Sequence, residues 1–296
     1  MSREFIKTDE LIRLCYDNLV PQVANHKFKG IIGIPRSGMM LASAMATLLH
    51  VPLYSIEKNG MRLLSGWSEW GGGRMRYYEK SLRSGEEETF LVVDDWVWTG
   101  RETRRAKTIL NKYHPEKRFI FSTVYIAEDR TDSVDFYSKE VSRKNFPYCE
   151  WHFMSSFFIK DTILDIDGLL CEDAPMNILK DTNRYVDFIT KVSPSAYIPR
   201  RLPCHCILTG RSEKYRAITE QWLNEHGILY NDLQMYPETG RKVITLSELC
   251  RYKSNFFSSS KAHLLVESHC GLARCINKTT GKRTVCLPEG RIFQNE

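Results

Sequence analysis

Short apolar runs alternate with amphipathic stretches through the first half of the chain. One such stretch, residues 8–23, places Leu11, Leu14 and Leu19 on a single helical face. The pattern predicts strands at 28–34, 51–58, 89–95 and 118–126, and helices at 8–23, 39–50 and 101–113. Strands that alternate with helices in this way favour an α/β domain built on a mainly parallel sheet.

The alternation of strands and helices starts again after residue 160. The pattern predicts strands at 162–170, 204–210 and 262–268, and a helix at 212–226. Two separate series indicate two α/β domains, each a mainly parallel sheet flanked by helices. We place these domains at 1–150 and 160–296, with the boundary in the aromatic stretch around 150–158.

Composition and charge narrow the class of protein. The 296 residues are 42% hydrophobic and 26% charged, which is typical of a soluble globular protein. No apolar run is long enough to cross a bilayer, and the N-terminus lacks the apolar core of a signal peptide. The net charge of +6 suits a protein that handles phosphates, and by itself does not indicate nucleic acid.

The cysteines predict a reducing environment. Nine of them, an odd number, are scattered without a tight framework, so we expect free thiols in a cytoplasmic protein. Cys204 and Cys206 admit two interpretations, half of a metal site or alternate positions on one buried strand. No second pair stands at zinc spacing.

Two adjacent acids follow the apolar run of the strand expected at 89–95. Asp94 and Asp95 would be costly inside a buried parallel strand, so we expect them at its exposed carboxyl end. The following turn, Thr99 to Thr103, offers backbone N–H groups, hydroxyls and a helix N-terminus, which favour an anionic phosphate. Together they predict a sugar-phosphate site. A solvated loop with a threonine helix cap explains a hydroxyl but not the two acids.

A second turn between a strand and a helix supports the same interpretation. The sequence GIPRSG, Gly33 to Gly38, contains Arg36, which can neutralise another phosphate group. One glycine turn is weak evidence, whereas an acidic and a basic turn in one domain indicate a specific site.

The run VVDDWVWTGRET resembles the signature of the type I phosphoribosyltransferase family, in which an apolar strand and two acids lead to Thr-Gly-x-x-Thr. GIPRSG stands where that family has its pyrophosphate-binding loop. The resemblance covers residues 1–150 and implies a glycosyltransferase that uses phosphoribosyl pyrophosphate and Mg²⁺, with a nucleobase or similar small molecule as acceptor. By resemblance, Asp94 and Asp95 bind the ribose hydroxyls, Thr99, Gly100, Arg101, Glu102 and Thr103 hold the 5′-phosphate, and Arg36 and Ser37, with Gly38, hold the pyrophosphate.

The chain departs from that family pattern in two places. Trp96 and Trp98 are bulky for the spacer after the acids, so we expect the rim of the site to stack on a base or on a partner. Residues 59–88 stand where the family has a mobile hood. The arginines there either close on the pyrophosphate or are solvated charges; they are Arg62, Arg74 and Arg76.

A second pair of acids lies at the end of the strand expected at 162–170. Asp165 and Asp167 are two residues apart, and Gly168 allows a sharp turn. Such acids can act as nucleophile and proton donor, or share a divalent cation. The alternative is a carboxylate pair at a surface turn.

Polar residues in the later segments weigh against that alternative. Thr209 ends one strand, Glu267 ends another, and Lys253 stands between them. This order resembles the haloacid dehalogenase superfamily of phosphohydrolases over residues 160–296, and LTGR resembles its nucleotide and polynucleotide phosphatase branch. By resemblance, Asp165 forms an aspartyl phosphate, Asp167 donates a proton and then activates water, Thr209 holds the phosphoryl group, Lys253 (with Lys261 as the weaker candidate) neutralises it, and Glu267 binds Mg²⁺ with Asp165 and the carbonyl of Asp167.

The second resemblance also has departures. Glu267 replaces the usual aspartate, and Ser268 replaces a second acid. A glutamate can still bind Mg²⁺, so we expect catalysis, although it could be weakened. Only residues 172–201 are available for a cap, so the site is either open to a large substrate or covered by the first domain.

The leading functional hypothesis is a bifunctional enzyme. The first domain makes a phosphoribosylated product, and the second is a Mg²⁺-dependent phosphatase that acts on a nucleotide or sugar phosphate. The alternatives are one active domain beside a sensor of phosphoribosyl pyrophosphate or nucleotide, and a non-enzymatic regulator. No helix-turn-helix or RNA-binding motif supports nucleic acid as a partner, and a homodimer is compatible with the sequence.

Overall fold

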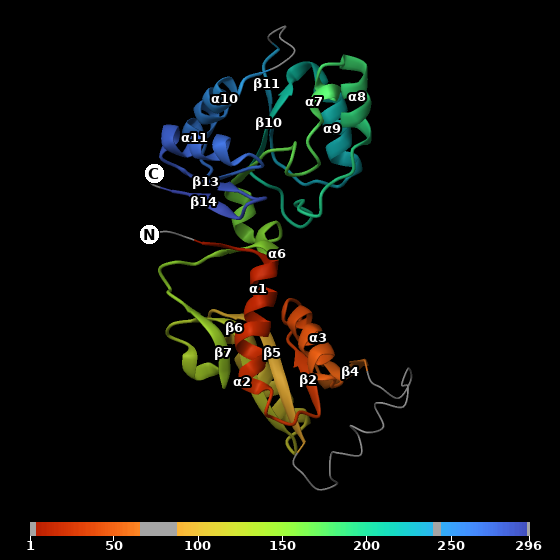
Figure 1. Cartoon of the computed structure of the whole chain (residues 1–296), viewed down its shortest axis with the longest axis vertical. Coiled ribbons are helices and arrows are strands. Elements are labelled where there is room, and N and C mark those ends of the chain that lie inside the picture. The colour runs from red at the N-terminus through yellow and green to blue at the C-terminus, as the bar shows by residue number, and fades with distance from the viewer. Residues whose placement is uncertain (1–3, 66–87, 239–243, 295–296) are drawn as a thin grey trace. The chain divides into compact units, whose positions relative to one another are not determined.

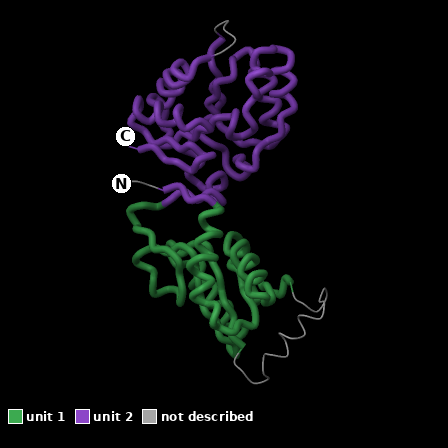
Figure 2. Tube along the Cα trace, viewed as in Figure 1, with its two compact units in different colours: residues 1, 8–146 green, residues 2–7, 147–296 purple. Residues whose placement is uncertain are grey.

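The computed structural model describes residues 4–65, 88–238 and 244–294 (Figure 1). It divides into two compact units, residues 1 and 8–146 and residues 2–7 with 147–296 (Figure 2). The dividing point lies just before the aromatic stretch in which we placed the boundary, and the boundary residues themselves stay a prediction. No helix within the described ranges combines the length and the apolar character that a membrane crossing requires.

The first unit contains a six-stranded sheet of order β4-β3-β2-β5-β6-β7. All neighbours are parallel except β3 and β4, which form an antiparallel hairpin. The strands are β2 (Gly30–Gly33), β3 (Leu53–Glu57), β4 (Gly60–Ser65), β5 (Thr89–Val97), β6 (Arg118–Ala127) and β7 (Phe136–Val141). The helices are α1 (Thr8–Leu14), a π-helical turn (Cys15–Leu19), α2 (Val20–Val23), α3 (Gly38–Leu49) and α5 (Arg101–Tyr113).

Helices cover both faces of this sheet. Phe90 and Val92 of β5 pack against Ala106 and Leu110 of α5, in a cluster that also contains Phe121 of β6. Successive side chains of a strand point to opposite faces, so the residues that alternate with Phe90 and Val92 along β5 face the other side of the sheet. Figure 1 shows α1, α2 and α3 in front of β2, β5 and β6, which covers that side.

The second unit contains another six-stranded sheet, of order β11-β10-β9-β12-β13-β14. Its strands are parallel except for the last pair. The strands are β9 (Thr162–Leu164), β10 (Cys206–Ser212), β11 (Leu233–Tyr236), β12 (Leu264–Glu267), β13 (Arg283–Cys286) and β14 (Arg291–Phe293). The helices are α6 (Glu150–Phe153), α7 (Met176–Leu179), α8 (Thr182–Lys191), α9 (Arg216–Glu225), α10 (Leu246–Ser259) and α11 (Cys270–Thr280).

Alternating side chains also divide the core of the second unit. Ile163 and Leu265 belong to the cluster that packs on α10 and α11, whereas Leu164 and Val266 belong to the cluster that contains Trp222 of α9. The predicted fold class, mainly parallel α/β sheets flanked by helices, is therefore confirmed.

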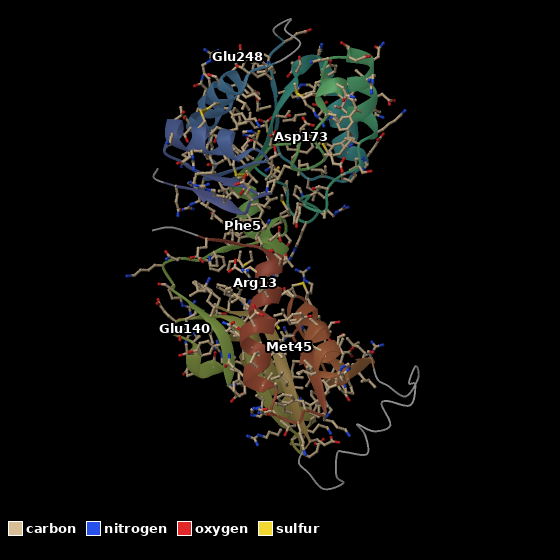
Figure 3. All side chains as sticks on the ribbon, viewed as in Figure 1. Phe5, Arg13, Met45, Glu140, Asp173 and Glu248 are labelled. Carbon is tan, nitrogen blue, oxygen red and sulfur yellow. A yellow bond between two sulfur atoms is a disulfide. The ribbon has the colours of Figure 1, made fainter. Side chains whose placement is uncertain are left out.

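A short strand pair joins distant parts of the chain within the second unit. β1 (Phe5–Ile6) pairs in parallel with β8 (Tyr148–Cys149). Phe5, labelled in Figure 3, packs edge-to-face on Phe153 at 5.5 Å between ring centroids. The side-chain Nζ of Lys7 donates a hydrogen bond to the carbonyl of Pro288 at 2.9 Å. Residues 5–7 are therefore part of the second unit.

Four expectations about local structure were wrong. β5 does not end at its two acids but continues to Val97. β9 ends at Leu164, before its acids, and β10 continues past Thr209 to Ser212. The β5 backbone can continue because its neighbour β6 still supplies pairing partners as far as Ile126. The cysteines are not all free thiols, because disulfides join Cys250 to Cys275 and Cys270 to Cys286.

Candidate functional site

In the first unit, two turns between a strand and a helix meet at the carboxyl ends of β2 and β5. The N–H of Ile34 donates to the carbonyl of Val93 at 3.0 Å. A β-carbon at Gly38 would lie 2.5 Å from that carbonyl oxygen and 3.2 Å from Oδ1 of Asp94. Only glycine permits this close approach. The structure therefore brings the turn that contains Arg36 and Ser37 to the acidic end of β5.

The two acids on β5 are buried, not exposed as we expected. Asp94 is 8% exposed and Asp95 is 4% exposed, and the N–H of Asp95 donates to Oδ1 of Asp94 at 3.0 Å. Burial, and then the neighbouring Asp95, raise the pKa of Asp94 well above its usual range. Two buried carboxylates side by side destabilise each other's charged form, so they gain most from a ligand that donates hydrogen bonds.

The raised pKa predicts a stability effect for Asp94→Asn. The folded state binds more protons than the unfolded state between the ordinary carboxyl pKa and the raised value, so wild type loses stability as pH rises through that range. The asparagine variant has no such loss. We expect its melting temperature to exceed that of wild type by several degrees at neutral pH, since about 1 kcal/mol corresponds to roughly 3–5 °C in a domain of this size.

Scanning calorimetry of both proteins across the acidic to neutral range measures this difference. The advantage of Asp94→Asn should shrink as pH falls toward the ordinary carboxyl range, where wild type also becomes protonated in both states. Asp132→Asn, at an exposed position of the same unit, is the control and should leave the melting temperature unchanged. A variant that melts below wild type at neutral pH contradicts the prediction.

The turn after β5 has the geometry of an anion-binding helix start. Gly100 has a φ of 67° and is the N-cap of α5, and the N–H of Arg101 donates to Oγ1 of Thr99 at 3.3 Å. Thr103, in the first helical turn, is buried. The first N–H groups of a helix have no carbonyl partner within the helix and point along its axis. The predicted phosphate-binding residues therefore lie together on one turn.

Aromatic side chains gather beside this turn. The ring centroids of Trp96 and Trp98 are 5.7 Å apart, and those of Trp98 and Phe146 are 4.9 Å apart. The guanidinium of Arg143 lies 4.5 Å from the centroid of Trp98, and Asp129 holds it through a 2.6 Å ion pair. The indole N–H of Trp96 is buried and has no hydrogen-bond partner among the described residues. We expected the tryptophans to stack on a base or on a partner; in the structure they stack on side chains of the same unit.

The predicted hood lies mostly outside the described residues, including Arg74 and Arg76. Arg62, on β4, pairs with Glu57 at 3.4 Å and is exposed. The part of the segment that the structure describes is thus mainly the hairpin strand β4, on which Arg62 is engaged with Glu57.

In the second unit, the predicted residues Asp165, Lys253 and Glu267 converge at the carboxyl ends of β9 and β12. Thr209 does not end its strand as we expected, because β10 continues to Ser212. Asp165 directly follows β9, and its backbone N–H donates to the carbonyl of Val266 at 3.1 Å. Nζ of Lys253 lies 2.8 Å from Oδ2 of Asp165 and 2.7 Å from Oε1 of Glu267. Lys253 and Glu267 are each 1% exposed. Lys261, the weaker candidate, is exposed and belongs to the loop before β12.

Helix α10 places Lys253 at this point. Thr245 caps the helix by accepting from the N–H of Glu248 at 3.2 Å, and the side chain of Glu248 accepts from the N–H of Thr245 at 2.9 Å. This capping box fixes the first residue of α10, and Glu248 is labelled in Figure 3. Lys253 then lies two helical turns later, on the buried face of the helix.

The charged groups of this cluster shift one another's pKa values. Burial, followed by Asp165, raises the pKa of Glu267 well above its usual range. Burial lowers the pKa of Lys253, but Asp165 and Glu267 outweigh it and leave that pKa above its usual value. Oε2 of Glu267 is buried and has no hydrogen-bond partner in the described structure. A hydrogen-bond donor, a water or a cation could satisfy this oxygen.

Arg211 is a site residue to which the sequence analysis gave no role. Its Nε lies 3.0 Å from Oδ2 of Asp167, and its Nη2 lies 2.6 Å from Oδ1. The N–H of Arg211 donates to Oγ1 of Thr209 at 3.1 Å, and Thr209 is fully buried. The remaining guanidinium nitrogen, Nη1, is buried and has no hydrogen-bond partner within the described ranges. Arg211 is the arginine of the motif LTGR, at the end of a predicted buried strand. A buried arginine needs an anionic partner, so the motif could have indicated this role.

Asp165, Asp167, Arg211, Lys253 and Glu267 line a cavity of about 380 Å³, whereas the fully buried Thr209 is not part of its wall. Its wall also contains Tyr185 and Tyr215, which pack edge-to-face at 5.2 Å, and the leucines 246 and 249. Asp173, labelled in Figure 3, lies in the loop before α7 and also borders the cavity. Partial burial, then Asp167 and Asp165, raise the pKa of Asp173. Sequence reasoning missed Asp173 because it stands outside every motif that we considered.

The cysteine pair considered as half a metal site is buried in the sheet. Cys206 begins β10, and Cys204 bridges to Tyr230 just before that strand. Within the described ranges, three His, Cys, Asp or Glu ligand atoms come within 4.8 Å of one another only at Cys270, Cys286 and Glu289, and the first two of these form a disulfide. The alternative of two positions on a buried strand therefore accounts for Cys204 and Cys206.

The first unit therefore has the features of α/β domains that bind phosphorylated ligands: a parallel sheet, a helix N-terminus that can bind phosphate, and paired acids near the carboxyl ends of the strands. The chain belongs to the phosphoribosyl transferase domain family, whose model matches residues 3–153.

Two relatives in sequence are phosphoribosyltransferases. The xanthine-guanine phosphoribosyltransferase of Desulfotalea psychrophila is 30% identical over 140 residues, which cover 44% of this chain and 74% of that protein. The enzyme of the same name from Chromohalobacter salexigens is 27% identical over 142 residues, or 45% and 74% of the two chains. A purine phosphoribosyltransferase structure from Pyrococcus horikoshii covers 51% of this chain and 95% of its own at 14% identity, with a TM-score of 0.36.

Proposed function

We propose that the first unit transfers a phosphoribosyl group from phosphoribosyl pyrophosphate to a nucleobase. The observation that supports this most is the contact of Gly38 with Val93 and Asp94, which joins the basic turn to the acids. In this proposal Asp94 and Asp95 accept hydrogen bonds from the ribose hydroxyls. The turn Thr99 to Thr103 holds the 5′-phosphate, through backbone N–H groups and hydroxyls.

Departure of pyrophosphate from C1 of the ribose leaves positive charge on the sugar and negative charge on the leaving group. Arg36, Ser37 and the backbone beside Gly38 bind the leaving group, which lowers the cost of its charge. Asp94 and Asp95 keep the sugar in place and are themselves relieved of their buried, unfavourable pairing. Mg²⁺, when bound with the substrate, neutralises the pyrophosphate.

The acceptor that we propose is a purine base. The relatives named above are xanthine-guanine enzymes, and the aromatic group beside the phosphate turn suits a flat heterocycle. Trp98 is intermediate in exposure and Phe146 is 37% exposed, so both can still contact a ligand. Arg143 stacks on Trp98 and can donate hydrogen bonds from the edge of its guanidinium.

We propose that the second unit is a Mg²⁺-dependent phosphatase. The carboxylates that line its cavity, Asp165, Asp167, Asp173 and Glu267, face three cationic side chains, Arg211, Lys253 and Lys214. This lining would repel a phosphate dianion unless a cation were bound. Among the described residues that line this cavity, two buried side-chain atoms have no hydrogen-bond partner: Nη1 of Arg211, which can donate to an anion, and Oε2 of Glu267, which can bind a cation. A phosphate together with Mg²⁺ satisfies both.

The donor set fits Mg²⁺, which prefers one or two carboxylates and keeps several waters. Asp165, the carbonyl of Asp167 and Glu267 would hold it, and it would neutralise the transferring phosphoryl group. Oδ of Asp165 attacks phosphorus, the bond to the leaving oxygen breaks, and Asp167 gives that oxygen a proton. Asp167 then takes a proton from the water that hydrolyses the aspartyl phosphate. Asp167 pairs with Arg211 as a carboxylate, so it has to leave Arg211 and take up a proton from solvent before it can act as the acid of the first step.

The substrate that we propose for the second unit is a nucleotide or a sugar phosphate. Tyr185 and Tyr215 on the cavity wall favour the nucleotide, because their rings can pack against a base. Dephosphorylation of the nucleotide made by the first unit is the simplest link between the two reactions. Because such metabolites are cytoplasmic, we propose the same location for the enzyme.

One assay tests both activities separately. The full chain is incubated with phosphoribosyl pyrophosphate, Mg²⁺ and single purine bases, and pyrophosphate and inorganic phosphate are measured independently. We expect base-dependent pyrophosphate release, followed by phosphate release that stops when EDTA removes Mg²⁺. If pyrophosphate is released but no nucleotide product releases inorganic phosphate, the proposed phosphatase activity is contradicted. No pyrophosphate with any base contradicts the transferase, and binding without turnover would then indicate a sensor.

A further inference from the structure

We propose that Asp173 and Ser268 together hold a water of the Mg²⁺ ion in the cavity of the second unit, so that Asp173 is a positioning residue for the metal. This inference rests on the proposed phosphatase function. It concerns a residue to which neither the sequence motifs nor the family match gives a role.

Gly168 brings these two side chains together. A β-carbon at Gly168 would lie 2.6 Å from Oδ2 of Asp173 and 2.8 Å from Oγ of Ser268. Both oxygens therefore face the same small space above the turn that follows Asp165 and Asp167. The φ of Gly168 is 72°, so glycine is needed there for backbone conformation as well as for space.

Asp173 is a carboxylate at the exposed edge of the cavity. It makes no hydrogen bond or ion pair with a described residue, and the neighbouring acids outweigh the cationic side chains His269 and Lys253 in their effect on its pKa. Arg211 is engaged with Asp167, and Lys253 is engaged with Asp165 and Glu267. A carboxylate in this position is stabilised by a divalent ion nearby, which would offset its repulsion by the other acids.

A second observation points independently to an ion in this cavity. Glu267 is 1% exposed, and its Oε2 has no hydrogen-bond partner in the part of the chain that the structure describes. Glu267 immediately precedes Ser268, so the unpaired oxygen and the space between Ser268 and Asp173 belong to the same end of β12. Mg²⁺ keeps several waters, and side chains that hold such waters act on affinity without direct coordination.

The inference predicts weaker metal binding in Asp173→Asn. Isothermal titration of the full chain with Mg²⁺ alone should give a dissociation constant roughly tenfold higher than that of wild type, the usual size of an outer-shell loss. Glu172→Gln is the matched control, because it removes an exposed carboxylate from the adjacent position of the same loop. It should leave the affinity unchanged.

A second variant tests the shared position. Ser268→Asp in the Asp173→Asn background returns a carboxylate to the same space, and should recover most of the lost Mg²⁺ affinity. Wild-type affinity in Asp173→Asn, an equal loss in Glu172→Gln, or no recovery in the double variant would each overturn the inference. Failure of the proposed function is distinguishable, because wild type itself would then bind no Mg²⁺, and Glu267→Gln would change nothing.

Discussion

Asp165→Asn should abolish phosphate release by the full chain while leaving pyrophosphate release intact. Asp165 is the acid that the structure places at the end of β9, within 2.8 Å of Lys253. Asparagine has nearly the same shape but is not a nucleophile toward phosphorus. Loss of a nucleophile that forms a covalent intermediate costs at least roughly a thousandfold in kcat. Release of inorganic phosphate from nucleoside monophosphates measures the effect.

Asp161→Asn provides the matched control. Asp161 lies just before the other end of the same strand and is exposed, so the same chemical change should have no effect on phosphate release there. Beryllofluoride with Mg²⁺ should form an adduct on Asp165 of wild type and on no residue of Asp165→Asn. Phosphatase activity that survives in Asp165→Asn would falsify the assignment of the nucleophile.

The double variant Asp94→Asn with Asp95→Asn should lose binding of phosphoribosyl pyrophosphate. Each acid is proposed to accept a charge-assisted hydrogen bond from a ribose hydroxyl, and such bonds contribute roughly 1.5–3 kcal/mol each. Loss of both should raise the dissociation constant on the order of a hundredfold or more. Calorimetric titration with phosphoribosyl pyrophosphate and Mg²⁺ measures this loss, and phosphatase activity should be unchanged.

A control with the same change in net charge distinguishes loss of the two ribose contacts from a general effect of charge on binding. Asp132→Asn with Glu116→Gln removes two exposed carboxylates from the first unit and should leave binding near the wild-type value. Unchanged affinity in the Asp94 and Asp95 variant would remove these acids from the ribose site. Combined with the expected gain in stability of Asp94→Asn, a loss of binding would show that these acids are kept for function at a cost to the fold.

Much of the architecture could be predicted because local patterns and topology agree. The helix expected at 101–113 is α5, Arg101–Tyr113, and the strand expected at 89–95 is the first part of β5. The extension of β5 through Asp94 and Asp95 could not be predicted, since burial of two acids depends on what surrounds them. Strand β4 was missed because its pairing with β3 comes from a tight hairpin, and its own residues are largely exposed.

The candidate site in the second unit was predictable only in part. Asp165 and Glu267 are recognisable because strand ends of a parallel sheet meet at one edge. Thr209 was misplaced, because β10 continues past it to Ser212. The pairing of Arg211 with Asp167 depends on a side-chain direction, and the approach of Asp173 to Ser268 depends on the path of a loop. Neither follows from spacing along the chain. The same is true of the two disulfides, whose partners are brought together by α10, α11 and β13.

The pairing of β1 with β8 makes the first unit an insertion within the second. During synthesis, Phe5 and Ile6 leave the ribosome long before their partners at Tyr148 and Cys149, so the second unit closes late. A gene cut between residues 146 and 147 would leave β1 on the wrong fragment and uncover Phe153. An isolated second unit therefore has to be built as a splice of the two segments, with a linker long enough to join two parallel strands.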